Sequence, residues 1–172
     1  MNILLEHIHK KTEVFSKKPL FLYLADDAMP VDERLLFAPC MAHFVFSFMD
    51  INRFVLPDIT GNSECHKLIN VHADEDAWHW PWYLQDLISM QLDPLLPFSD
   101  ALRFLWGEAT RRSRFLSYRC IAMIGRATVI QKIAIVETIE MTGKVFLDHT
   151  ANLCALWPDA PAEMMYFGKN HA

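Results

Sequence analysis

Two histidines and several acidic residues lie close together in the stretch His72-Ala-Asp-Glu-Asp-Ala-Trp-His79. On a helix of 3.6 residues per turn, four of these side chains fall within an arc of about 100°: His72, Glu75, Asp76 and His79. Apolar residues share the stripe at Ile69, Tyr83 and Leu87, so it is predicted to face a core. Imidazole combined with carboxylate suits Fe(II), Mn(II) or Zn(II). We expect a metal site here; the alternative is a helix face with histidine–carboxylate ion pairs at the edge of a bundle.

A metal site on one helix needs further ligands from neighbouring helices. Glu137 and Glu140 lie one turn apart in VETIEMTGK, and either could face the centre of a bundle. Glu140 and Lys144 also have the spacing of a surface salt bridge, which is the competing interpretation. His171, close to the C-terminus, is the remaining candidate ligand. A ferritin-like di-iron bundle is not favoured, because it requires two Glu-x-x-His motifs on different helices.

Other residues could support such a site without binding the metal. His43 and Asp50 share a face of one predicted helix and could orient ligands through hydrogen bonds. The alternative is that they are hydrogen-bonded residues of the core or its edge. Trp78, Trp82 and Phe146 are candidate walls of an apolar substrate pocket.

Prolines and turn clusters divide the chain into long helical segments, and no sustained strand-like alternation is present. Helices are predicted over residues 2–16, 32–55, 63–92, 99–126 and 128–156, with kinks at Pro39 and Pro81. Gly107 and Gly125 are expected on one face of the fourth helix. A final helix from about residue 161 stops in mid-pattern, which favours a truncated version of a longer chain. The prediction is an all-α bundle forming one domain over residues 1–172.

Composition excludes several classes of protein. With 52% hydrophobic and 22% charged residues, the 172-residue chain is neither disordered nor of low complexity. A net charge of −5 argues against a nucleic-acid partner. No uninterrupted apolar run of membrane-spanning length and no signal peptide is visible, so no membrane association is expected. The four cysteines show no metal-binding spacing and are expected to be reduced thiols in a cytoplasmic protein.

Four segments occur in an order that resembles the heme-oxygenase-like superfamily: HADEDAWHWPWYLQDL, LRFLWGEATRRSR, VETIEMTGKVF and YFGKNHA. The resemblance covers roughly residues 30–172. It is closest to the iron-containing redox enzymes, or heme-oxygenase-like di-iron oxidases, which include the chlamydial protein associating with death domains. TenA-type thiaminases share the fold. The resemblance implies a heme-oxygenase-like helical bundle.

The resemblance also implies a set of iron ligands. His79 matches the histidine of the first ligand helix, whereas His72 stands where the family usually has Glu, with Glu75 as its substitute. Glu140, or Glu137, matches the carboxylate of the later helix, and Asp76 is a further alternate. His171 matches the first histidine of a final motif whose other two ligands would fall beyond this chain. Heme is not expected, because no close Gly-x-x-x-Gly pair is present.

The leading hypothesis is therefore a cytoplasmic protein that binds one or two iron ions and activates oxygen against a small organic substrate. Whether it forms a homodimer stays open. A second hypothesis is a non-catalytic module of the same fold, with a degenerate metal site, that binds a ligand or a partner. The third is a TenA-like hydrolase of thiamin-type pyrimidines, which would require a cysteine nucleophile and no iron.

Overall fold

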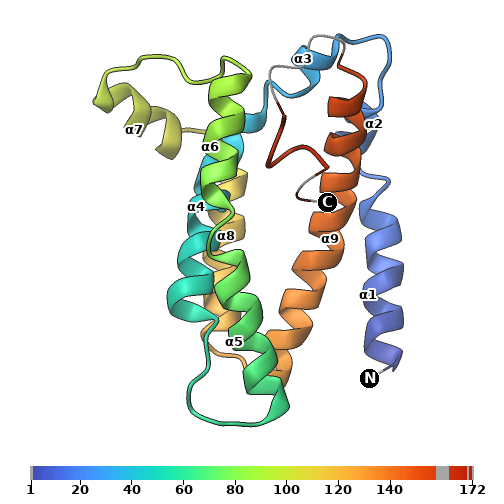
Figure 1. Cartoon of the computed structure of the whole chain (residues 1–172), viewed down its shortest axis with the longest axis vertical. Coiled ribbons are helices and arrows are strands. Elements are labelled where there is room, and N and C mark those ends of the chain that lie inside the picture. Colours follow the sequence, from blue (N-terminus) through green and yellow to red (C-terminus); the bar gives the residue numbers. More distant parts are fainter. Residues whose placement is uncertain (1, 158–162, 170, 172) are drawn as a thin grey trace.

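The computed structural model describes residues 2–157, 163–169 and 171, and these contain helices and no strand, as predicted for an all-α protein (Figure 1). The elements, in chain order, are α1 Asn2–Phe15, α2 Pro19–Leu24, α3 Val31–Arg34, the 3-10 helix η1 Ala38–Met41, α4 Ala42–Asp50, the π-helix η2 Ile51–Val55, α5 Glu64–Asp76, α6 Trp80–Ser89, α7 Phe98–Trp106, α8 Arg111–Ile124 and α9 Val129–Ala155.

The long helix α9 is the element against which much of the chain packs. It begins with a capping box: Gln131 N donates to Thr128 Oγ1 at 3.4 Å, and Thr128 N donates to Gln131 Oε1 at 2.9 Å. This start agrees with the helix predicted over 128–156. Helix α1 lies alongside α9, and α5 and α8 pack against it from another side (Figure 1).

The helix predicted over residues 63–92 is two helices. α5 ends at Asp76 and α6 begins at Trp80, with Pro81 in its first turn. Because proline has no N–H, it cannot continue the hydrogen-bond ladder to Ala77, so the helix breaks where a kink was predicted. His79 becomes the N-cap residue of α6. The helical spacing that relates His72 to Asp76 therefore does not extend to His79.

The helix predicted over residues 99–126 is also divided. α7 ends at Trp106, Gly107 follows it as the C-cap residue, and α8 begins at Arg111; Gly125 likewise follows the last residue of α8. In the connecting turn, Thr110 Oγ1 donates to Leu105 O at 2.6 Å and closes the end of α7. The prediction that both glycines lie within one helix is wrong, since both occupy C-terminal caps.

The region predicted as a helix over 32–55 is nearly continuous, with Pro39 in the first turn of the 3-10 helix η1 and the π-helix η2 at its end. In the part of the chain that the structure describes, Val31–Val55 is the one stretch long and apolar enough to cross a membrane, by length and composition alone. Core helices of soluble proteins pass the same test. In this protein, α4 packs against α8 and α6.

Two groups of buried residues form the core. The first contains Phe21, Leu35, Tyr83 and Phe167, and the second contains Ile51, Ile69 and Ile124. Phe146 packs against the first group and Ile139 against the second, and both lie on α9. α9 thus spans both parts of the core.

The last described residues form no helix. Residues 161 and 162, where a final helix was predicted to begin, lie outside the described residues, and 163–169 form bends and a turn. This segment runs between α6 and α9 (Figure 1). On the α9 side, Cys154 Sγ lies 3.6 Å from Phe167 O and the ring of Phe146 contacts that of Phe167.

Candidate metal centre

Three side chains from two helices form a compact group of nitrogen and oxygen atoms. His72 and Asp76 lie one turn apart on α5, and Glu140 approaches them from the middle of α9. His72 Nε2 is 3.1 Å from Asp76 Oδ2 and 3.7 Å from Glu140 Oε1. One ligand atom from each residue lies within 4.8 Å of the other two. The three residues could therefore hold a metal ion.

His72 shows how well this group fits a metal. Its Nε2 is buried but has no hydrogen-bond partner, so the contact with Asp76 is close without being aligned as a hydrogen bond. The contact with Asp76 raises the pKa of His72, while burial acts in the opposite direction. A buried nitrogen without an aligned partner calls for an explanation. A cation held between this nitrogen and two carboxylates supplies one.

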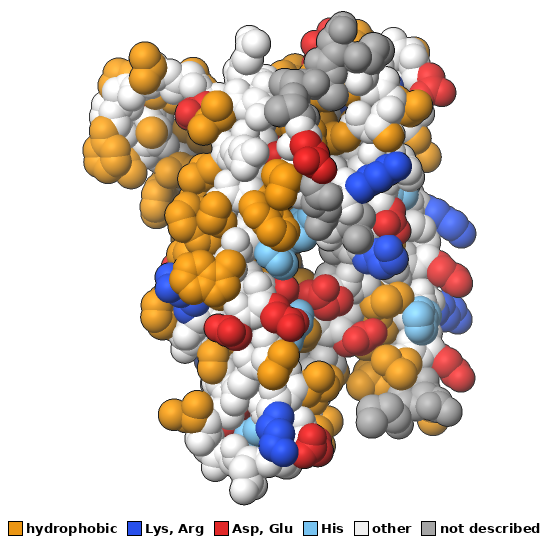
Figure 2. Space-filling view, viewed as in Figure 1, with side chains coloured by type: hydrophobic (Ala, Val, Ile, Leu, Met, Phe, Trp, Pro, Cys, Tyr) orange, Lys and Arg blue, Asp and Glu red, His pale blue; other side chains and the backbone are white. Residues whose placement is uncertain are grey.

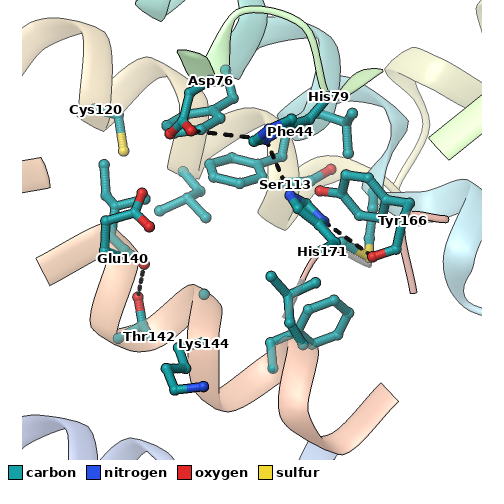
Figure 3. Close-up of a pocket in the computed structure, with 18 of the residues that line it drawn as sticks. Phe44, Asp76, His79, Ser113, Cys120, Glu140, Thr142, Lys144, Tyr166 and His171 are labelled. Carbon is teal, nitrogen blue, oxygen red and sulfur yellow. Dashed lines mark hydrogen bonds and ion pairs between the residues drawn. The ribbon is translucent and has the colours of Figure 1, made fainter. Parts of the chain in front are cut away.

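Two further histidines lie on the other side of Asp76. His79 Nδ1 is 3.8 Å from Asp76 Oδ1 and 3.1 Å from His171 Nε2 (Figure 3). His171 Nδ1 lies 3.0 Å from the backbone oxygen of Tyr166, which can only accept, so Nδ1 carries the proton. In neutral His171, Nε2 then presents its lone pair toward His79. Metal-binding histidines typically donate their other N–H to a carboxylate, a backbone carbonyl or a water in this way.

Asp76 connects the two halves of the cluster, because one of its oxygens faces His72 and the other faces His79. Burial lowers the pKa of His171, with a further contribution from His79, and this favours the neutral imidazole that metals bind. Partial desolvation and the charge of Asp76 raise the pKa of Glu140, although its side chain is 51% exposed. Three imidazoles and two carboxylates suit Fe(II), Mn(II) or Zn(II).

Trp82 holds the histidine rings in place. Its indole stacks on His79 with ring centres 4.8 Å apart and planes 18° from parallel, and meets His171 edge-on at 5.6 Å. Trp82 lies on α6, in the turn that follows the break at Pro81. The break thus places His79 between Asp76, Trp82 and His171.

His171 depends on a residue that the sequence analysis missed. Asp86 on α6 is fully buried, and its carboxylate accepts three backbone N–H groups: Met165 at 2.8 Å, Tyr166 at 2.8 Å and Phe167 at 2.9 Å. Burial raises the pKa of Asp86, and these three donors oppose that effect. The available signal was its position three residues after Tyr83, on the inward stripe of the helix.

The cluster lies at the wall of a cavity of about 540 Å³. Asp76, His79, Glu140, Tyr166 and His171 are among its lining residues, and the rest of the lining is mostly apolar. The apolar lining includes Phe44, Val45, Phe48, Met49, Leu116, Ile139, Phe146 and Leu147. Figure 2 shows acidic side chains and histidines gathered around a hollow in the centre of the visible face.

Several predicted site residues lie elsewhere. Glu75 is exposed and affects His72 only through its charge, whereas Asp76, an alternate in the prediction, has the central position. Glu137 is half-buried and does not line the cavity. Helical spacing alone left Asp76 and Glu75 equivalent, as it did Glu140 and Glu137. The packing of α5 against α9 separates the members of each pair.

Of the residues predicted to support the site or to form the pocket, some lie at the cavity and others do not. The ring of His43 contacts Ser47, Trp106 and Tyr118, away from the cluster, and Asp50 is exposed. Trp78 is 55% exposed and packs against the guanidinium of Arg53. Phe146 lines the cavity.

In the comparisons with known proteins, the chain matches no family model and no curated sequence. Fold and site together define an all-α protein with a candidate metal centre at the wall of an apolar cavity.

Proposed function

We propose that this chain is an iron-binding oxidoreductase that activates oxygen against a small organic substrate with a largely apolar body. The observation that carries the proposal is the convergence of His72, Asp76 and Glu140, whose ligand atoms lie within 4.8 Å of one another. Two of the three, Asp76 and Glu140, line the cavity. His79 and His171 extend the set beyond Asp76. The five side chains come from α5, the α5–α6 junction, α9 and the C-terminal segment.

Metal binding and the positioning of the ligands would fall to different residues. His72, Asp76 and Glu140 would hold one ion, and Asp76 could share a second ion with His79 and His171. Iron bound there would supply the electrons and the open coordination positions that oxygen chemistry requires. The backbone carbonyl of Tyr166 keeps the proton of His171 on Nδ1 by accepting a hydrogen bond from it, and Trp82 fixes the ring of His79.

The apolar lining of the cavity is the reason for expecting a substrate with an apolar body. Phenylalanine and aliphatic side chains exclude water and would bind an apolar body beside the cluster. Apart from the cluster and Tyr166, the polar side chains of the lining include Lys144, which pairs with Asp148, and the two hydroxyl residues Ser113 and Thr142. The two hydroxyls already donate to backbone carbonyls, Ser113 to Cys40 O at 2.8 Å and Thr142 to Thr138 O at 2.8 Å. We therefore expect recognition to depend on shape more than on hydrogen bonds.

The TenA-like alternative requires a thiolate nucleophile. Burial raises the pKa of Cys40 and Cys120, and raises that of Cys154 to about 12. Cys120 lines the cavity, but its environment favours the thiol form. The cysteines with shifted pKa values therefore give that alternative no support.

The remaining alternative is a non-catalytic binding module, in which ion pairs replace the metal. Anaerobic loading with Fe(II), followed by measurement of bound iron and of oxygen uptake, separates it from the proposed function. Asp76→Asn is expected to lose most of the bound iron and the oxygen uptake, because Asp76 contacts both halves of the cluster. Asp74→Asn is the matched control, since Asp74 is an exposed residue of the same helix.

The wild type and Asp74→Asn are expected to retain iron and consume oxygen equally. If the wild type retains no iron, or if Asp76→Asn retains as much as the wild type, the proposed function is wrong. Ligand binding to the metal-free protein would then support the binding module.

A further inference from the structure

We propose that Asp86 is the positioning residue for His171: its buried carboxylate fixes the backbone of residues 165–167, and this segment holds His171 at the metal centre. The inference rests on the proposed function for its consequence in metal binding. The hydrogen bonds between Asp86 and the amides of residues 165–167, here called the tether, can be tested without a metal.

The contacts form a continuous chain from α6 to His171. Asp86 Oδ1 accepts Met165 N, and Asp86 Oδ2 accepts both Tyr166 N and Phe167 N. The carbonyl of Tyr166 then accepts Nδ1–H of His171 at 3.0 Å. The same peptide segment is thus held by its amides on one side and orients the histidine through a carbonyl on the other.

The burial of Asp86 indicates that this contact is specific. Its side chain is 0% exposed, so its ionised form depends on the donors that surround it. Three backbone amides within one short segment supply these donors. An uncharged apolar residue would fill the same space in the core, but it could not fix the segment in register.

The segment also closes part of the cavity. Tyr166 and His171 both line it, and the rings of these two residues lie 4.7 Å apart (Figure 3). Releasing residues 165–167 would therefore displace a ligand and a cavity wall together. Asp86 would act on both while not lining the cavity itself.

Gly168 provides a second way to disturb the tether. A Cβ atom at this position would lie 2.0 Å from the carbonyl oxygen of Met164, so the backbone must move. Gly168→Ala leaves Asp86 unchanged and alters the turn between the tethered amides and His171. It therefore tests whether residues 165–167 position His171 even if Asp86→Asn does not fold.

The first measurement uses metal-free protein. Asp86→Asn keeps the shape of the side chain but replaces one accepting oxygen by a donor. We expect faster amide exchange confined to residues 164–169, and loss of the Nδ1-protonated signature of His171 in ¹⁵N NMR spectra. Asp93→Asn, at an exposed position just after α6, is the control and should leave both signals unchanged.

The second measurement is Fe(II) affinity under anaerobic conditions. Asp86→Asn, Gly168→Ala and His171→Ala are each expected to weaken binding by about 10- to 100-fold. The double variant Asp86→Asn/His171→Ala should bind no more weakly than His171→Ala alone, because both substitutions remove the same ligand. If Asp86 had only a general structural role, the loss of Fe(II) affinity caused by Asp86→Asn would add to the loss caused by His171→Ala.

Additive losses of Fe(II) affinity in the double variant would overturn the inference. So would a folded Asp86→Asn in which amide exchange and the NMR signature of His171 are the same as in the wild type. If the wild type binds no Fe(II), the proposed function fails, and the metal-free exchange and NMR measurements decide the positioning role alone.

Discussion

Asp76 is the residue that connects the two groups of histidines in the candidate site. Its two carboxylate oxygens face different histidines, His72 at 3.1 Å and His79 at 3.8 Å. The sequence placed Asp76 on the correct stripe of α5 but could not rank it above Glu75, because the choice depends on the path of α9. Asp86 was missed for a related reason: an acidic residue on an inward stripe does not reveal which amides will surround it.

His43 leads to a prediction about pH at the residue scale. Burial lowers its pKa, and the charge of Arg114 lowers it further. A histidine whose folded pKa lies below its unfolded value takes up its proton more readily in the unfolded chain. Its contribution to stability is therefore present above the unfolded pKa and is lost as the pH falls through that value, about 6.5.

The free energy of unfolding should thus fall less between pH 7.5 and pH 5.5 in His43→Gln than in the wild type. Urea denaturation at both pH values measures the difference. An equal fall in the two proteins would show that His43 does not titrate differently on folding.

At the scale of elements, the helices found and the helices predicted differ mainly at two breaks. Apolar periodicity continues through residues 77–79 and 107–110, so it could not show that α5–α6 and α7–α8 are separate. Pro81 and Gly107 were visible in the sequence, but a proline or glycine within an apolar pattern is compatible with a kink as well as a break. The start of α9 was predictable, because Thr128 and Gln131 form a local cap that needs no tertiary contact.

Lys132 joins two elements and carries a prediction about stability. This residue of α9 is 7% exposed, and its Nζ donates to Leu56 O at 2.9 Å, beside Val55 O at 3.5 Å, at the end of η2. Lys132→Met should lower the free energy of unfolding by about 1.5–3 kcal/mol, because carbonyls at the end of η2 lose a charged donor.

Lys144→Met is the control on the same helix. Lys144 is exposed and forms a surface ion pair with Asp148 four residues later, so its replacement should change the free energy of unfolding by less than about 0.5 kcal/mol. Urea denaturation of the three proteins measures both effects. Equal losses in the two variants would mean that Lys132 does not hold η2 to α9.

At the scale of the whole molecule, the cavity lies where the two parts of the core meet. Val45 belongs to the first group of buried residues and Cys120 to the second, and both line the cavity. Asp76, His79, Glu140 and His171 occupy its polar wall, which is formed by segments distant in sequence (Figure 3). The sequence pointed to Glu140 and His171 as candidate ligands from other segments, but composition and helical spacing alone cannot show that residue 171 lies beside residue 79.

The most direct test of the metal centre is anomalous diffraction at the iron edge from crystals of the full chain loaded anaerobically with Fe(II). We expect an anomalous peak within coordination distance of His72, Asp76 and Glu140; a second peak between Asp76, His79 and His171 would indicate two ions. Iron bound only elsewhere on the chain, or no anomalous peak from crystals soaked in saturating Fe(II), would contradict the account.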